Sequence, residues 1–445
     1  MAVLRTKIVW TDPNGEPVTL TDVKQINVRK SSDMGNNAGD FGLRNPITNL
    51  TLYMDNEGIR FNPEQDVLFY ARYDDDGTGL PETYDNLIFS GRVVEFEGES
   101  TDTKTDIKVS TVDSSFIVLN RIYIGDEFGP VNETVKKVIG FANNNTPELS
   151  KQIVVADESD GGFLADEKSD GTEFPGVQYS SAGRPVYKVL QELAQPLYTG
   201  EAENVNYRFF VDRNNELHFF YPSDGVQHVI VEGSRETESA VYTHPITGED
   251  ISFDDTNIHK LIQTKLKLAV YDITNFIIYK AGEDLEGNQI MNFAFAPTSG
   301  VPITKDSFRS WEKITKKLKQ DEESVGNLTK EYGDRYTVAN SSGTTSWGVA
   351  YGSEEAYNNA LVQRAENIAE AIADAEFRAT ADPRWRGSIE VQGQNIYEPG
   401  DALMFTSNRL GIQDIFMRIV DVQHSISKGG WFTNLTVQEE FKVVL

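Results

Sequence analysis

Apolar and polar residues alternate along residues 1–120, so that apolar side chains recur at every second position. Successive side chains of a β-strand point to opposite faces, and this alternation therefore predicts strands with one buried face. Gly, Asn, Asp and Pro separate the runs, as turns require. The predicted strands are residues 7–10, 25–29, 47–54, 67–73, 87–96 and 106–111.

Residues 395–441 show the same kind of pattern near the other end of the chain. Three apolar-rich runs follow a turn at Pro399-Gly400, and Gly429-Gly430 marks a hairpin just before Trp431. These features predict a small antiparallel barrel segment.

Short elements of the first region recur in the same order later in the chain. The matches pair residues 47–53 with 273–279, 63–69 with 399–405, 92–96 with 418–422, and 107–109 with 435–437. Apolar residues occupy corresponding alternate positions in the matched strands, as one buried face requires. The order predicts two copies of one β-domain, the second split by a long insertion.

The stretch between the two copies changes to a helical pattern. Val131, Val135, Val138 and Ile139 predict a short amphipathic helix, with Asn132 as a plausible cap. A polar, irregular connection at residues 145–180 precedes a second predicted helix at 185–197. A β-hairpin at residues 207–221, turning at Asn214-Asn215, completes a predicted α+β domain.

The insertion contains the most helical sequence of the chain. Residues 311–323 place Ile314 and Leu318 four apart among lysines, and residues 353–380 carry an apolar stripe that ends at Asp382-Pro383. The stripe is interpreted as packing within its own domain, with a subunit-interface helix as the alternative.

The expected fold is α+β and mainly β: two similar tube-type β-barrel domains, an inserted α/β domain and a helical insertion, assembling as a ring. The predicted domains are residues 1–125, the first tube-type domain; 126–225, the α+β domain; 226–300, the first part of the second tube-type domain; 301–384, the helical insertion; and 385–445, the remainder of the second tube-type domain.

Composition limits the classes of function. The chain has 445 residues and a formal net charge of −28, from 69 Asp and Glu against 41 Lys and Arg. Such acidity argues against a nucleic-acid groove or an anionic membrane as the main partner. The chain has no cysteine, and the sequence shows neither a signal peptide nor an apolar stretch of membrane-spanning length.

No motif for catalysis or cofactor binding is present, so no catalytic, cofactor-binding or metal residue is assigned. The sequence contains no phosphate-binding loop, dinucleotide fingerprint, zinc-protease motif or nucleophile elbow. Its five histidines lack metal-ligand spacing, and His424, within a predicted strand, is interpreted as a packed or surface residue and not as a catalyst. A pair of carboxylates suited to glycoside hydrolysis remains an alternative, because their separation is a spatial property.

One loop has a partial calcium-binding pattern. Asp74, Asp76, Thr78 and Asp85 fall at ligand positions of a calcium loop, but Pro81 and the strand before Asp74 depart from that motif. A plain hairpin loop is the favoured interpretation.

The residues also carry a family resemblance. The turn Glu398-Pro399-Gly400-Asp401 followed by residues 418–437, together with residues 91–99 and 108–121, resembles the baseplate hub proteins of tailed phages and related contractile injection systems. The resemblance implies a trimeric hub with two tube domains per chain, which caps the tail tube and holds a spike. The chain ends soon after the second predicted barrel, so spike and wall-degrading parts are expected on other chains.

Two similar domains in each of three chains would let a trimer imitate a six-fold ring. The expected partners are therefore two further copies of the chain, the tail tube protein, the spike protein and other baseplate proteins. DNA is expected to pass through an acidic channel without specific binding, and no membrane insertion is expected. The expected location is the virion tail baseplate, after assembly in the host cytoplasm.

Two functions from other classes remain open at this stage. A tail-associated cell-wall hydrolase or peptidase would need a catalytic cluster, whereas a receptor-binding adhesin would need an exposed aromatic patch. Trp431-Phe432 is the candidate for such a patch, but packing of this hairpin aromatic on its own barrel is the favoured interpretation. For a hub, the loop at residues 31–45 and the hairpin at residues 428–431 are the expected contact regions. Deleting residues 36–40 is expected to weaken assembly without unfolding the chain.

Overall fold

The structure is a computed structural model of the whole chain. It describes residues 3–12, 14–20, 23–31, 48–54, 65–74, 83, 86–101, 104–145, 152–157, 164–168, 170–194, 196–200, 207–221, 228–232, 239–243, 250–254, 258–268, 276–283, 289–295, 316–320 and 385–439. The chain divides into two compact units. The larger comprises residues 1–200, 207–267 and 384–445, and the smaller comprises residues 201–206 and 268–383.

All strands predicted in the first 120 residues are confirmed. The first half of the sheet consists of β1 (Val3–Thr11), β2 (Pro17–Leu20), β3 (Val23–Ser31), β4 (Thr48–Met54), β5 (Asp66–Asp74), β6 (Leu87–Thr101) and β7 (Lys104–Asp113). Their order across the sheet is β2-β1-β5-β6-β7-β4-β3. Only the short β2 had no counterpart in the sequence prediction.

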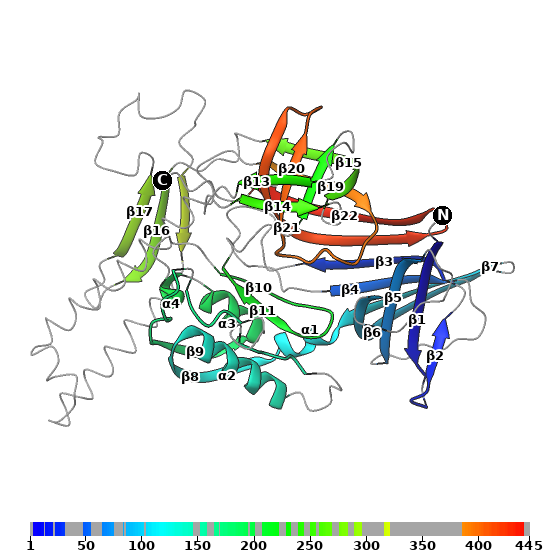
Figure 1. Ribbon diagram of the computed structural model, residues 1–445. Helices are drawn as coiled ribbons and strands as arrows, with labels where there is room; N and C mark the ends of the chain where they lie inside the picture. Colours follow the sequence, from blue (N-terminus) through cyan, green and yellow to red (C-terminus); the bar gives the residue numbers. More distant parts are fainter. Residues whose placement is uncertain are drawn as a thin grey trace, which may run out of the picture. The chain divides into compact units, whose positions relative to one another are not determined.

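The second half of the sheet comes from two separate stretches of the chain. It consists of β12 (His228–Glu232), β15 (Ile258–Leu268), β19 (Trp385–Gln392), β20 (Ala402–Ser407), β21 (Ile412–Ser427) and β22 (Gly430–Glu439). The order continues from β3 as β21-β20-β12-β15-β19-β22, and β22 also pairs with β21. Figure 1 shows the red and orange strands of this half beside the blue strands of the first.

The strands of the two halves form one connected sheet of 13 strands, so the two predicted barrels are not separate. The long strand β21 is the reason. Its first part, Ile412 to Arg418, pairs with β20, and its second part, Asp421 to Ser427, pairs with β3. Residues 416–422 of β21 are all buried, as expected of a strand covered on both faces. One strand therefore belongs to both halves.

The hairpins β6–β7 and β21–β22 have the same register from end to end. Gly91 lies opposite Asp113 as Met417 lies opposite Glu439. At the other end, Thr101 opposite Lys104 corresponds to Ser427 opposite Gly430. The register shift after Val93 recurs after Ile419. Because a slip of one residue would turn every side chain to the other face, this agreement confirms that the halves share one plan.

The same plan confirms two of the predicted matches and shifts a third. Asp66 lies opposite Arg92 as Ala402 lies opposite Arg418, so the match of β5 with β20 and of β6 with β21 is confirmed. In the last match, the counterpart of Leu435 is Val109 instead of Ile107, because Val109 lies opposite Phe96 and Leu435 opposite Val422.

The predicted match between residues 47–53 and 273–279 is wrong. The neighbour of β7 is β4, and the corresponding neighbour of β22 is β19, with Leu52 opposite Val109 as Ile389 is opposite Leu435. Residues 276–279 instead pair within a separate three-stranded sheet. The similarity of letters there reflects a shared strand pattern of apolar residues, which many β-strands have.

The counterparts follow one another along the chain in the same order in both halves. β1, β3, β4, β5, β6 and β7 correspond to β12, β15, β19, β20, β21 and β22. The halves also differ: β12 is parallel to β20 whereas β1 is antiparallel to β5, and β12 pairs with β15 whereas β1 and β3 are not neighbours in the sheet. In chain order, the hairpin of β13 (Ser239–Thr243) and β14 (Asp250–Asp254) stands where the first half has β2. The smaller unit enters between β15 and β19, where the first half has residues 32–47.

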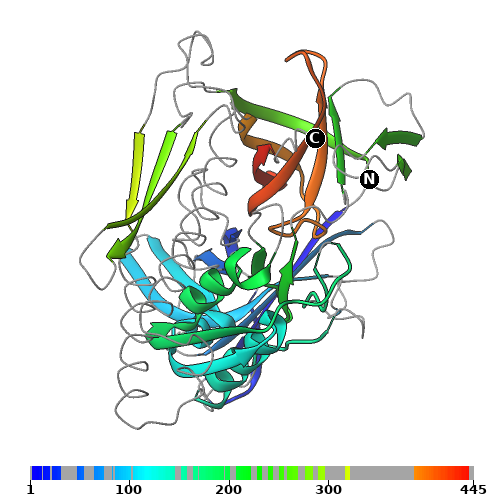
Figure 2. The same ribbon diagram turned by 90° about the vertical axis from the view of Figure 1, so that its left-hand side faces the viewer.

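The α+β segment between the halves largely follows the prediction. It contains α1 (Ser114–Leu119), β8 (Ile122–Gly129), α2 (Val131–Asn144), β9 (Val177–Pro185), α3 (Val186–Leu193), α4 (Pro196–Thr199), β10 (Arg208–Val211) and β11 (Leu217–Phe220). Helices α2 and α3 lie together beside β8 and β9 (Figure 2). Asn132 is not the cap of α2: Pro130 occupies the cap position, and Asn132 lies within the first turn. The second predicted helix ends earlier, at Leu193.

The described part of the smaller unit is a sheet of β16 (Phe276–Glu283), β17 (Gln289–Phe295) and β18 (Lys316–Gln320). β16 is central, antiparallel to β17 and parallel to β18. The helix predicted at residues 311–323 is therefore wrong for residues 316–320, where Leu318 lies opposite Ile278 in a strand pair. The helix predicted at residues 353–380 lies outside the described residues.

Candidate functional site

The two halves of the sheet join where β21 of the second half pairs with β3 of the first. β21 pairs with β3 in antiparallel register, with His424 opposite Val28 and Ile426 opposite Ile26. On the outward face, the guanidinium of Arg29 donates to the carboxylate of Asp421 through Nε at 2.8 Å. This carboxylate raises the pKa of Arg29. The junction thus combines backbone pairing with a charged contact.

A buried ion cluster lies under the junction. Lys30 of β3 donates to Glu398 at 2.8 Å, and Arg213, in the turn between β10 and β11, lies 3.3 Å from the same carboxylate. Arg213 also donates to the side-chain oxygen of Asn395 at 2.6 Å. Burial lowers the pKa of Lys30, while Glu398 opposes that shift. The first half, the α+β segment and the second half therefore meet at one carboxylate.

The turn Glu398-Pro399-Gly400-Asp401 that the sequence singled out holds this carboxylate in place. The carboxylate of Asp401 accepts the backbone N–H of Glu398 at 2.8 Å and contacts His228 of β12 at 2.9 Å. Gly400 has a φ of 98°, and a side chain there would meet the ring of Phe220. The turn residues consequently have structural roles that explain their types.

Trp431 packs in an unexpected place. The sequence predicts packing on its own barrel, but the indole belongs to the core of the first half, with Ile8, Leu52 and Phe69 among its members. It stacks on Tyr73 of β5 at 5.9 Å and is only 2% exposed. Its neighbour Phe432 is 39% exposed. The second half therefore contributes a core residue to the first, and the aromatic pair is not an exposed patch.

His424 is a packed residue, whereas the sequence left both a packed and a surface position open. The indole N–H of Trp431 donates to Nδ1 of His424 at 3.3 Å, and Thr433 contacts the same nitrogen at 2.9 Å. A ring nitrogen that accepts an N–H must itself be unprotonated. Burial, assisted by the cations Lys30 and Arg213, lowers the pKa of His424 well below its ordinary value.

This pKa predicts acid sensitivity. In the unfolded chain a histidine binds a proton below about pH 6.5, whereas His424 in the folded chain does not until a lower pH. The unfolded state then binds more protons, so stability falls as pH drops below that value, by up to about 1.4 kcal/mol per pH unit. We expect His424→Gln to reduce this slope in urea unfolding measured between pH 7 and pH 5.5. An unchanged slope would contradict the assignment.

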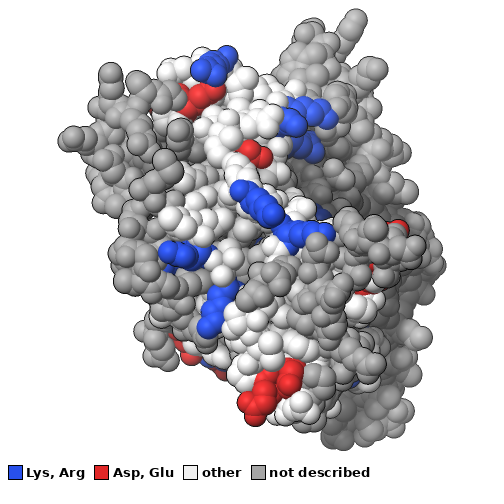
Figure 3. Space-filling model, turned by 90° about the vertical axis from the view of Figure 1, so that its right-hand side faces the viewer, with Lys and Arg blue, Asp and Glu red and all other residues white. Residues whose placement is uncertain are grey.

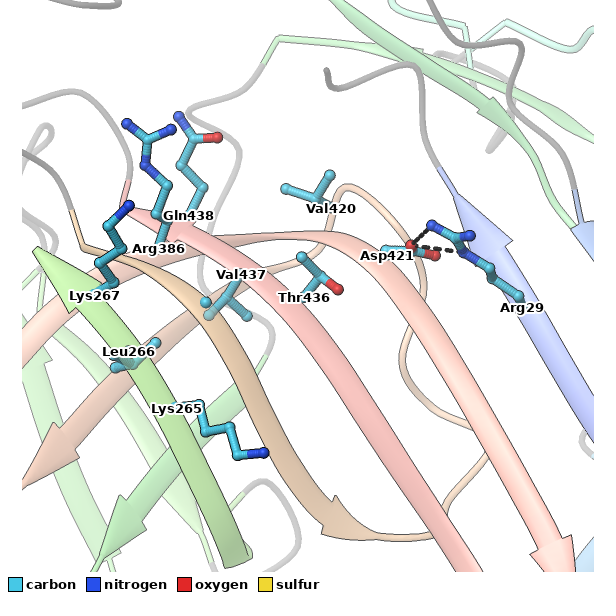
Figure 4. Close-up of a pocket in the computed structure, with 11 residues that line it drawn as sticks. Arg29, Lys265, Leu266, Lys267, Arg386, Val420, Asp421, Thr436, Val437 and Gln438 are labelled. Atoms are coloured by element: carbon cyan, nitrogen blue, oxygen red, sulfur yellow. Dashed lines mark hydrogen bonds and ion pairs between the residues drawn. The ribbon is translucent and has the colours of Figure 1, made fainter. Parts of the chain in front are cut away.

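A cavity of about 620 Å³ opens beside the junction (Figure 4). Its charged lining residues come from four strands: Arg29 of β3, Lys265 and Lys267 of β15, Arg386 of β19 and Asp421 of β21. Four cationic side chains against one carboxylate make this surface basic, although the chain is strongly acidic. A basic surface of this kind favours an acidic partner.

Figure 3 shows that charge is distributed unevenly on one face of the molecule. Among the described residues on that face, Lys and Arg side chains extend from the top to below the middle, and acidic side chains lie near the top, at the right and at the bottom. Basic side chains are therefore prominent among the described residues of this face, although the chain as a whole is acidic.

Several sequence predictions fall outside the described residues. These include the loop at residues 31–45 after Ser31 and most of the calcium-like loop after Asp74. Within the described ranges, no group of three or more His, Asp or Glu side chains could hold a metal ion. None of the helices described is long and apolar enough to cross a bilayer.

No known family model matches the sequence, and no curated protein matches it. Solved structures do. The tail protein from Neisseria meningitidis MC58 is 9% identical with a TM-score of 0.51, over 98% of this chain and 97% of that one. The 43 kDa tail protein of prophage MuSo2 from Shewanella oneidensis is 11% identical with a TM-score of 0.52, over 97% of this chain and 98% of that one.

These likenesses extend over nearly the whole chain, and at such low identity they concern the fold. The fold is that of phage and prophage tail proteins, which is consistent with a baseplate hub. The resemblance noted in the sequence is thereby confirmed at the level of fold.

Proposed function

We propose that this protein is a structural hub of a phage-type tail baseplate. In this role three copies form a ring with pseudo-six-fold symmetry, which joins the hexameric tail tube to the central spike and surrounds the path of the DNA. The observation that carries the proposal is the agreement in strand order and register between the two halves of the sheet. Three chains with two similar halves can match a ring of six.

The tube-type domains in this proposal are residues 1–125 and the combination of residues 226–268 with 385–445. The segment 226–300 expected from the sequence is shortened, because β16 and β17 pair in the separate sheet of the smaller unit. Residues 126–225 form the α+β domain between them, and residues 269–384 form the insertion. The role is structural, with no catalytic step. The acidic composition suits a channel that DNA crosses without binding, because like charge repels phosphates at short range.

The mass of the purified protein tests this proposal. We expect a trimer, either for the protein alone or after mixing with the tube and spike proteins encoded beside it, and a ring of six similar lobes in electron micrographs. The same preparation should release no soluble fragments from host cell walls. A protein that stays monomeric with these partners, or a ring of another order, would overturn the proposal.

A further inference from the structure

We propose that the edge of β6 from Glu97 to Thr101 pairs with the edge of β15 from Gln263 to Lys267 in a second copy of this chain. This pairing would repeat between chains the β21–β3 junction that each chain contains. The inference rests on the proposed ring and adds the strands and residues that hold it together.

β6 has the same pairing geometry as β21, but no described strand lies beside it where β3 lies beside β21. β5 pairs with β6 only as far as Arg92, just as β20 pairs with β21 only as far as Arg418. Beyond that point β21 continues on β3, from Asp421 to Ser427. The counterpart stretch of β6 begins at Glu95, and among the described strands β7 is its one partner.

β15 has the geometry of β3 and likewise extends beyond its neighbour. β12 pairs with β15 only at Ile258, His259 and Lys260, so the rest of that edge has no strand beside it within the described ranges. An open strand edge is a template for pairing with another chain. The chain thus presents two such edges, and they are counterparts of the two strands already joined inside it.

The register of the proposed pair follows from the register of β21 with β3 within the chain. Leu50 lies opposite Val28, and the counterpart of Leu50 is Gly387, which approaches Lys265 and Leu266 so closely that a side chain there would clash. Leu266 is half-buried, whereas Lys265 and Lys267 are exposed. Leu266 is therefore the counterpart of Val28.

Lys267 is then the counterpart of Arg29, and Lys265 that of Asn27. Since Gln423 lies opposite Arg29, and Ser425 opposite Asn27, the proposed pair sets Glu97 opposite Lys267 and Glu99 opposite Lys265.

The side chains on the two edges are complementary. Glu95, Glu97 and Glu99 are all exposed on β6, and they would face the basic strand that lines the cavity of Figure 4. Glu95 is the counterpart of Asp421, so its contact with Lys267 would repeat the Asp421–Arg29 ion pair. Exposed apolar side chains accompany the charges, with Phe96 43% exposed on β6 and Ile262 46% exposed on β15.

Charge reversal tests the pairing. We expect Glu97→Lys/Glu99→Lys, and separately Lys265→Glu/Lys267→Glu, to weaken trimer formation by about tenfold or more, because each places like charges opposite each other. Combining all four substitutions should restore assembly. The control Glu167→Lys/Glu173→Lys reverses two exposed acidic residues of the α+β segment and should leave assembly unchanged.

A cysteine pair tests the register, since the chain contains no cysteine of its own. Glu97→Cys/Lys267→Cys should give disulfide-linked chains under mild oxidation, because directly opposed residues of paired strands meet the geometric requirement of a disulfide. Glu97→Cys/Leu266→Cys should not, since neighbouring residues of a strand point to opposite faces.

The outcomes separate this inference from the proposed function. The strand pairing would be overturned if the wild-type protein is a trimer, both charge-reversal variants are trimers too, and the variant with cysteines at residues 97 and 267 forms no disulfide. The hub proposal would then still stand. A wild-type chain that never forms a trimer would overturn both.

Discussion

Replacing Glu398 with alanine is expected to lower the free energy of unfolding by about 3–5 kcal/mol, because it leaves Lys30 buried beside Arg213 without their shared carboxylate. The buried ammonium cannot reach water to regain hydration. Chemical denaturation of the purified variant at neutral pH measures this loss. A change below about 1 kcal/mol would mean that the cluster is already hydrated and is not a structural centre.

Two further variants identify the cause of that loss. Glu133→Ala removes a carboxylate from the exposed pair with Lys136 on α2 and should cost only about 0.5 kcal/mol. Adding Lys30→Met to Glu398→Ala removes the stranded charge and should recover part of the lost stability, since an apolar side chain suits this site. If the double variant were less stable than Glu398→Ala, the charge at Lys30 would not be the source.

Trp431→Ala is the second substitution with a large expected effect, a loss of about 3–5 kcal/mol, because the indole fills the core of the first half. The loss should appear in both halves at once, since the side chain belongs to a strand of the second half and packs against Tyr73 of the first. Hydrogen exchange should show reduced protection in β3 and β21 as well as in β22.

Phe432→Ala is the matched control, one residue along the same strand and facing outward. With 39% of its surface exposed, Phe432 should contribute roughly 1 kcal/mol or less. Equal losses at the two positions would contradict the packing described for Trp431. Unchanged protection of β3 in Trp431→Ala would show that the two halves are stable independently of this contact.

The sequence alone predicted most strands of the first half correctly, since side-chain alternation is a local property of a strand. It also detected the repeat where equivalent positions need the same type of residue. Examples are the turn that contains Glu398 and the strands that contain Arg92 and Arg418. It failed at residues 316–320, where one leucine among lysines suits either a helix or a strand, and pairing with β16 decides for the strand.

The candidate site was only partly visible in the sequence. His424 could be interpreted as a packed or surface residue and the Glu398 turn could be singled out, but the sequence named neither the partner of Glu398 nor the core in which Trp431 packs. Lys30 and Glu398 are separated by 368 residues, and Arg29 and Asp421 by 392. Contacts between residues so far apart in the chain leave no periodic pattern in a single amino-acid sequence.

The sequence by itself determined that this is a mainly β protein built on a repeated plan, because strand periodicity and turn chemistry are local. The tertiary structure decided which strand is the partner of which: β19, and not the look-alike strand at residues 276–283, takes the place of β4. Strand pairing joins segments through backbone N–H and C=O groups, which all residues except proline share, so residue types alone do not specify which strands pair.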